Sequence, residues 1–248
     1  MLSLVFSLVA LVILGSVDAA KPLPSYITAC RLSDPDLSKC AIENANKAIG
    51  PLLNGDAEYK TPKLSPMKVP ELEMKSGDNL KIVLKDVTLY GLEKSLVENI
   101  KIDPKKHKVE IVVKVPWLNI DSQYTITGMI LILPISGNGP ANMTFYDSTF
   151  NYAFDYDLYK KKDGKDYMRI TKTYTDVNID NAYFRLDNLF NGNKELGENM
   201  NTFLNENAKD VVKELGYPVV HKLIDFIVQK VIQTLIRVVP YDQIFLVE

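Results

Sequence analysis

Residues 218–239 read Pro-Val-Val-His-Lys-Leu-Ile-Asp-Phe-Ile-Val-Gln-Lys-Val-Ile-Gln-Thr-Leu-Ile-Arg-Val-Val. The apolar residues stand in adjacent pairs, from Val219 with Val220 to Leu235 with Ile236, and a new pair begins every four residues. This length and spacing predict a helix rather than a strand. A second helical pattern covers 196–215, and Gly216-Tyr217-Pro218 predicts a break or kink between the two.

The apolar pairs of the long helix do not stay on one side in an ideal α-helix. Such a helix has about 3.6 residues per turn, so each four-residue step moves the pair by about 40° around the axis. Between Val219 and Leu235 the stripe turns by roughly 160°. Because a flat partner needs a stationary stripe, the pattern favours a helix held inside a curved sheet. The alternative is a long core helix packed between ordinary neighbours.

From about residue 78 to residue 190 the apolar residues recur at every second position, which predicts antiparallel strands with one dry and one wet face. In 108–117 the dry-face residues are Val109, Ile111, Val113, Val115 and Trp117. In 125–132 they are Ile126, Ile130 and Ile132, and in 145–159 they are Tyr146, Phe150, Tyr152, Phe154, Tyr156 and Leu158. The alternation shifts between Leu84 and Val87, which predicts a bulge and therefore a bend.

Residues 1–19 have the pattern of a signal peptide. The apolar run Leu4–Leu14 is too short to span a bilayer, and Val17-Asp18-Ala19 supplies small residues at the usual cleavage spacing. We therefore expect residues 20–248 to form one secreted, extracellular domain. No later apolar run reaches the length of a membrane span, so we expect no stable membrane insertion.

The expected secretion makes the two cysteines informative. Cys30 and Cys40 are close in sequence, and in an oxidising compartment we expect them to form a disulfide, whereas a zinc site would need further ligands. The tripeptide Asn142-Met143-Thr144 is a glycosylation acceptor, which predicts a glycan on Asn142.

The sequence lacks the usual signatures of catalysis and of nucleic-acid binding. A net charge of −2 does not suit a polyanionic partner. There is no G-x-S-x-G elbow, phosphate-binding loop, H-E-x-x-H or G-x-G-x-x-G. His107 lies in a lysine-rich turn and His221 on the polar side of the long helix, so neither is expected to act as a general base. We expect no enzyme activity, no metal and no cofactor.

Two lysine clusters, Lys105–Lys108 and Lys160–Lys162 with Lys165, fall at predicted hairpin tips. Ordinary solvation of turns explains charge at such positions, and it also discourages association of sheet edges. The functional alternative is a membrane-surface or lipid-recognition protein that docks on anionic headgroups through these tips.

Several segments in chain order resemble the takeout and juvenile-hormone-binding protein family of insects. They are Cys30 with Cys40, Ile130–Pro140, Asn188–Gly197, Phe203–Asn207 and Val239–Phe245. The resemblance implies a tubular lipid-binding fold, in which a curved antiparallel sheet wraps a long helix, and a carrier that holds a hydrophobic ligand in an internal tunnel without catalysis. Haemolymph carriers of juvenile hormone in this family have a second disulfide. This chain has no cysteines for it, so the takeout branch, with its circadian and feeding-related members, is the nearer match.

We therefore predict an α+β fold and a monomeric secreted carrier of a terpenoid, fatty acid or similar lipid, with no nucleic-acid partner. Alternation and helical spacing leave open whether the interior is a filled core or a tunnel. Phe226 interrupts the polar side of the long helix, and a contact with ligand or with a flanking strand would explain it. The residues expected to bind ligand are Ile111, Val113, Trp117, Ile130, Ile132, Phe150, Tyr152, Phe154, Leu223, Phe226, Ile227 and Val231.

Overall fold

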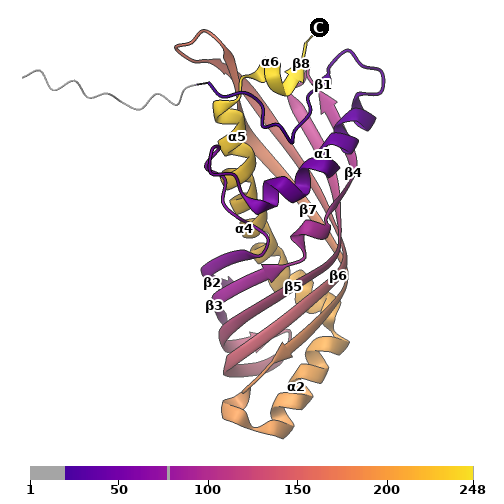
Figure 1. The fold of residues 1–248 in the computed structure, drawn as a ribbon. Coiled ribbons are helices and arrows are strands. Elements are labelled where there is room, and N and C mark those ends of the chain that lie inside the picture. Colours follow the sequence, from indigo (N-terminus) through magenta and orange to yellow (C-terminus); the bar gives the residue numbers. More distant parts are fainter. Residues whose placement is uncertain (1–19, 77–78, 248) are drawn as a thin grey trace, which may run out of the picture.

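The computed structural model describes residues 20–76 and 79–247, so the predicted signal peptide at 1–19 lies outside the described residues. A large antiparallel sheet curves beside a long C-terminal helical segment (Figure 1). The strands of the sheet are β2 (Met67–Ser76), β3 (Leu80–Tyr90), β4 (Leu96–Asp103), β5 (Lys108–Ile130), β6 (Leu133–Lys160) and β7 (Asp166–Leu186). The helices are α1 (Leu37–Asn54), α2 (Lys194–Glu206), α3 (Ala208–Val211), α4 (Tyr217–Ile227), α5 (Gln233–Val238) and α6 (Tyr241–Ile244).

The order of strands is β2-β3-β5-β6-β7, and β4 pairs with the first part of β5. Strand β5 is 23 residues long, which lets it pair with β4 near Lys108 and with β3 near Gly128. Two short 3₁₀ turns, η1 (Leu92–Lys94) and η2 (Phe190–Gly192), join larger elements. The predicted α+β fold, with a curved antiparallel sheet against a long helix, is confirmed.

The strands bend where their side-chain alternation changes. The predicted shift in β3 is confirmed, because its register with β5 changes between Lys85 and Thr88. Strands β5 and β6 show the same change of side-chain alternation, at positions that lie opposite each other. Buried side chains in β5 step from Val115 to Leu118, and in β6 inward residues step from Phe145 to Ser148. Asp147, between the last two, has a left-handed φ of 48°.

This second break corrects the predicted dry face. Trp117 pairs with Tyr146 across β5 and β6, and Tyr146 is 41% exposed. Consecutive residues of a strand point to opposite faces, so the buried Leu118 places Trp117 on the outer face. There Lys94 covers its ring, with Nζ 5.0 Å from the centroid. The alternation predicted for 108–117 and 145–159 therefore holds only on one side of the bend.

The long helical segment contains two π-helical turns, η3 (Val212–Gly216) and η4 (Val228–Ile232). A π turn holds more residues than an α turn because its hydrogen bonds run from residue i to i+5, so it winds less per residue. The two π turns therefore keep the apolar pairs, which recur every four residues, on one side of the helical segment. Polar residues face solvent along the whole segment, namely Lys213, His221, Lys222, Asp225, Gln229, Lys230 and Arg237.

The predicted spiralling stripe is therefore corrected, since it assumed an uninterrupted α-helix. The expected break at Gly216-Tyr217-Pro218 is a π turn followed directly by α4. Over the described residues the sheet does not close around the helix. Instead α4 contacts the edge strand β2, while α3 and α5 contact the opposite edge strand β7. The helix thus closes the gap between the two edges of the curved sheet.

Asparagine side chains cover two of the sheet edges. On β7, the Asn201 side chain accepts a hydrogen bond from the Leu186 N–H and donates one to the Leu186 carbonyl, both at 2.9 Å. Asn205, one turn along α2, makes the same pair of bonds to Phe184. Asn46 of α1 does so to Val97 on β4. Each amide takes the place of a neighbouring strand, which satisfies edge groups that would otherwise be free to pair.

The predicted disulfide between Cys30 and Cys40 is confirmed. It joins the short strand β1 (Cys30–Arg31) to the first turn of α1. Strand β1 pairs in parallel with β8 (Phe245–Leu246), close to the C-terminus. The disulfide thus connects α1 indirectly to the C-terminal segment.

We expect Asn201→Leu to lower the free energy of unfolding by about 2–4 kcal/mol, because it leaves two backbone groups of Leu186 without partners. Urea denaturation measures this change. Thr202→Leu, at an exposed position of the same helix, is the control and is expected to change stability by less than about 0.5 kcal/mol. Equal effects of the two substitutions would contradict the role assigned to the Asn201 amide.

We expect the double substitution Cys30→Ala with Cys40→Ala to lower the free energy of unfolding by about 2–3 kcal/mol, because an open chain has more conformational entropy when unfolded. Denaturation with and without a thiol reductant is the measurement. Reductant should destabilise the wild-type protein by a similar amount and leave the double variant unchanged. A wild-type protein insensitive to reductant would speak against this contribution.

Candidate functional site

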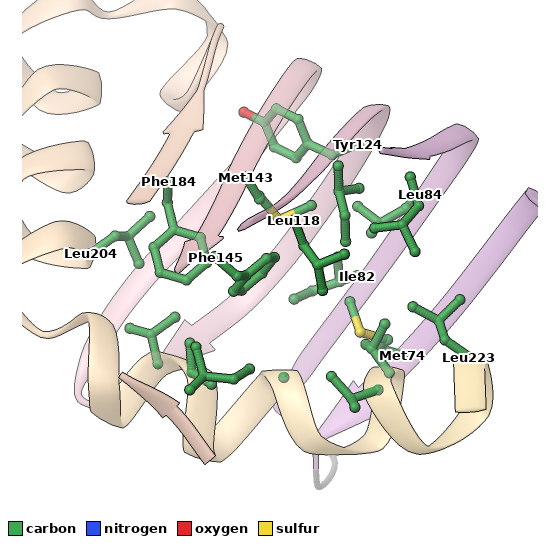
Figure 2. Close-up of a pocket in the computed structure, with 18 of the residues that line it drawn as sticks. Met74, Ile82, Leu84, Leu118, Tyr124, Met143, Phe145, Phe184, Leu204 and Leu223 are labelled. Carbon is green, nitrogen blue, oxygen red and sulfur yellow. The ribbon is translucent and has the colours of Figure 1, made fainter. Parts of the chain in front are cut away.

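A cavity lies between the sheet and the long helical segment (Figure 2). The space that the centres of water-sized molecules can occupy in it is about 150 Å³. One water molecule needs about 10–15 Å³ by the same measure. The sheet contributes Met74, Ile82, Leu84, Leu89, Leu118, Ile120, Tyr124, Ile126, Ile130, Met143, Phe145, Phe150, Ile179, Phe184 and Leu186. The other elements contribute Leu92, Leu204, Val211, Val212, Gly216, Val219, Val220, Leu223, Ile224 and Ile227.

The cavity wall is almost entirely hydrocarbon. Its polar exception is Tyr124, whose hydroxyl points away from the other labelled side chains and donates a 2.8 Å hydrogen bond to the Asp187 carbonyl (Figure 2). That hydroxyl is therefore occupied by the protein itself. None of the described wall residues is charged. Cavities with such walls exclude water and take up apolar molecules.

Beyond the bend, the concave face is packed with aromatic side chains. Phe154 lies 6.0 Å from Tyr152 and 6.4 Å from Tyr156, measured between ring centroids. Tyr156 in turn lies 6.1 Å from Tyr241 of α6, and their hydroxyls are 3.3 Å apart. Phe245 of β8 continues this aromatic column, 5.5 Å from Tyr241. The part around the cavity is called the hollow half below, and the part around the aromatic column is called the packed half.

The structure brings four of the predicted binding residues into the cavity wall, namely Ile130, Phe150, Leu223 and Ile227. Ile111, Tyr152 and Phe154 lie in or against the packed aromatic half, and Val113 touches the cores of both halves. Phe226 and Val231 pack in the core around the cavity without reaching its wall.

Trp117 and Ile132 lie away from the cavity. Trp117 is on the outer face for the reason given above. Strand β5 ends at Ile130, so Ile132 falls in the hairpin turn and is 79% exposed rather than continuing the alternation of 125–132. The predicted strand boundary is corrected accordingly.

Four of the wall residues that the sequence interpretation missed lie just past the bend. Leu118 and Ile120 in β5, and Met143 and Phe145 in β6, have the opposite parity to the residues predicted from the neighbouring runs. For β5 a signal is present in the sequence, since most even-numbered positions from Leu118 to Ile130 are apolar. A change of parity at Pro116 identifies Leu118 and Ile120.

Two buried hydroxyls on β6 have no hydrogen-bond partner among the described residues, those of Ser148 and Tyr152. They lie on either side of Phe150 on the inward face, and Phe150 is part of the cavity wall. Burial, with a smaller effect of the nearby Asp225 carboxylate, raises the pKa of Tyr152 to about 12. The Tyr152 hydroxyl is therefore a buried neutral donor, two residues along β6 from the wall residue Phe150 and outside the described cavity wall.

His107 and several lysines of the predicted hairpin tips contact neighbouring residues. His107 is half-buried and stacks on Tyr156 with 5.0 Å between ring centroids, whereas His221 is exposed. Lys160 and Lys106 pair with nearby carboxylates, and Lys161 lies over the Tyr167 ring and donates to the Arg237 carbonyl. No group of three or more His, Cys, Asp or Glu residues suited to a metal occurs in the described parts of the chain.

The glycosylation acceptor lies within a strand rather than in a loop. Asn142 is half-buried on β6, and its amide nitrogen donates to Asn119 and Asp121 on β5. A glycan on Asn142 would replace one of the two N–H groups of this nitrogen, so at most one of those bonds could remain. Within 20–76 and 79–247, none of the helices is both long enough and apolar enough to cross a membrane.

We expect the free energy of unfolding to fall as pH rises from 10 towards 12. The unfolded tyrosine ionises near pH 10, whereas burial raises the folded pKa of Tyr124 and Tyr152 to about 12. The folded chain then holds more protons, so each such group lowers stability by up to about 1.4 kcal/mol per pH unit. Tyr152→Phe should make this fall shallower, and Tyr146→Phe at an exposed position should not. Denaturation at pH 8 and at pH 11 measures how far the free energy of unfolding falls. An equal fall in the wild-type protein and in Tyr152→Phe would contradict the raised pKa of Tyr152.

Known proteins share both this fold and this sequence pattern. Residues 6–246 match the family model described as haemolymph juvenile hormone binding protein. The circadian clock-controlled protein daywake of Drosophila melanogaster is 29% identical over 200 residues, which cover 77% of this chain and 76% of that protein. Daywake of Drosophila yakuba is 28% identical over the same shares of both chains.

Takeout 1 of Epiphyas postvittana, a crystal structure, is similar with a TM-score of 0.82 and 30% sequence identity, over 89% of this chain and 100% of that one. These matches confirm the resemblance that the cysteine pair and the other motifs predicted. The chain therefore belongs to the haemolymph juvenile hormone binding protein family.

Proposed function

We propose that this protein is a secreted carrier that holds a hydrophobic small molecule in the cavity between the sheet and the long helix. The observation that carries the proposal is the uncharged hydrocarbon wall of that cavity. The one hydroxyl among its described residues, that of Tyr124, is already bonded to the protein. Burial of apolar ligand surface contributes roughly 25 cal/mol per Å², which supports binding after the costs of association are subtracted.

The walls favour a neutral ligand over an ionised one. A carboxylate placed among these side chains would lose its hydration without gaining a cation, and this is costly. A terpenoid, a long-chain ester or alcohol, or a protonated fatty acid fits better. Tyr152 supports a ligand with one hydrogen-bond acceptor, because its buried hydroxyl lacks a partner among the described residues and lies next to the wall residue Phe150.

Secretion is supported by the disulfide and by the leader pattern. A disulfide persists in oxidising compartments and is uncommon in the cytosol. The pattern of residues 1–19 matches that of a cleaved signal peptide. A carrier of this kind moves an apolar molecule through extracellular fluid without chemical change to it.

Filling the cavity tests the proposal. We expect Met143→Phe and Leu223→Phe, which enlarge side chains on opposite walls, to weaken binding of a fluorescent apolar probe such as phenylnaphthylamine by about tenfold or more, because overpacking costs about 1–3 kcal/mol. Fluorescence titration gives the dissociation constants.

Leu96→Phe is the matched control, because Leu96 is 50% exposed on β4 and does not line the cavity. It should leave probe affinity unchanged, and all variants should unfold cooperatively in urea. A wild-type protein that takes up no apolar probe, or cavity variants that bind it as well as Leu96→Phe, would overturn the proposed function.

A further inference from the structure

The hairpin turn between β5 and β6 has a composition that ordinary folding does not favour. Five apolar residues in a row, Met129 to Leu133, form the tip. Ile132 is 79% exposed and Met129 is 42% exposed, whereas Leu131 is half-buried against the main core. Turns at this position are usually polar or glycine-rich. The tip thus presents hydrocarbon to solvent where polar residues would be expected.

The backbone at this tip is also unfavourable for its sequence. Leu131 has a φ of 54°, in the left-handed region that glycine, asparagine and aspartate occupy more easily than leucine. Local choices that conflict with folding rules concentrate at functional positions. The exposed side chain of Ile132 and the strained backbone of Leu131 are therefore two independent indications of a role outside folding.

The tip lies at the end of the hollow half of the molecule. Ile130, the last residue of β5, and Ile126 both line the cavity, while the packed aromatic half contacts the other end of β5 at Val109. The neighbouring β2–β3 hairpin lies beside the tip, since the Met129 N–H donates a 3.0 Å hydrogen bond to the Asn79 carbonyl. The exposed apolar residues are thus at the cavity end opposite to the aromatic column.

We propose that this tip, formed by Met129, Leu131 and Ile132, docks transiently on a lipid bilayer and exchanges ligand with it at that end of the cavity. The inference rests on the proposed carrier function. A bilayer fits the tip better than a protein does, because a stable protein interface needs about 1,200 Å² or more of buried surface, which a convex two-residue turn does not offer. Insertion of so few side chains gives weak, reversible attachment, which suits a carrier that must leave again.

The rate of ligand transfer tests this inference. A fluorescent apolar probe is loaded into the protein and transferred to phosphatidylcholine vesicles. For the wild-type protein we expect a transfer rate that rises in proportion to vesicle concentration, because docking precedes release. Ile132→Asp should make the increase of the transfer rate with vesicle concentration about tenfold smaller, because an inserted isoleucine is replaced by a charge. Its probe affinity should be unchanged, because Ile132 lies outside the cavity wall.

Leu96→Asp is the control, an exposed apolar residue on β4 away from the tip. A transfer rate independent of vesicle concentration, or equal effects of Ile132→Asp and Leu96→Asp, would overturn the inference. Vesicles with added phosphatidylserine show whether Lys75 and Lys81 on the adjoining hairpin contribute, because only a charge contribution fades as salt rises.

A second readout does not depend on ligand. The two native cysteines are joined, so Ile132→Cys adds a single thiol for an environment-sensitive fluorophore. We expect a blue shift when vesicles are added, and none for the same label on Leu96→Cys. Absence of the shift at position 132 would reject docking. A protein that shows the shift yet binds no apolar probe would keep the docking surface and reject the carrier function.

Discussion

A curved sheet that does not close leaves a concave apolar face and unpaired strand edges in water, and most other features of this structure cover them. The long helical segment covers the face and reaches both edges, since it contacts β2 on one side and β7 on the other. Asn201 and Asn205 satisfy the backbone of β7, and Asn46 satisfies that of β4. Lys222 donates to the Glu73 carbonyl on β2. Side chains thus supply the hydrogen bonds that a further strand would have made.

The division of the interior into a packed half and a hollow half follows from the bend in the strands. At Pro116 in β5 and Asp147 in β6, the set of residues that faces inward changes parity. On one side of the bend the inward residues of β6 include Tyr152, Phe154 and Tyr156, whose rings pack against one another at tilted angles. On the other side they are Met143 and Phe145, opposite aliphatic residues of β3 and β5. The tilted rings pack closely in one half, whereas the largely aliphatic walls of the other half face one another across the cavity.

Much of the fold was predictable from the sequence because its strongest patterns are local. Alternation identified the strands, paired apolar residues identified the long helix, and the shift between Leu84 and Val87 identified the bulge in β3. The errors arose where two local patterns share one element. Extending the alternation of Phe150 and Tyr152 predicts an inward Tyr146, but the left-handed backbone of Asp147 reverses the alternation. Extending the alternation of β5 predicts an inward Ile132, but the strand ends at Ile130 in a turn that lacks the usual turn residues.

The helix shows why the site was harder to predict than the fold. The four-residue repeat is compatible with an α-helix whose stripe spirals and with one whose stripe is held straight by π turns, and the hydrogen-bond pattern that separates them is invisible in the sequence. With η3 present, Val211 and Val219 on either side of it both line the cavity, while Phe226 packs beside the cavity. An apolar stripe that stays on one side of the helical segment contacts the open side of the sheet along its whole length. A stripe that turned around the helix axis would not.

The cavity has two unlike ends, and under the proposed carrier function this difference constrains how a ligand would lie. One end meets the packed aromatic half, where the Tyr152 hydroxyl offers a buried donor. The other ends near Ile130, beside an exposed apolar turn. A molecule with one acceptor and a hydrocarbon body gains most when the acceptor reaches Tyr152, since a satisfied buried hydroxyl removes a desolvation cost. Its hydrocarbon body then extends toward the tip, so the wall chemistry favours one orientation over its reverse.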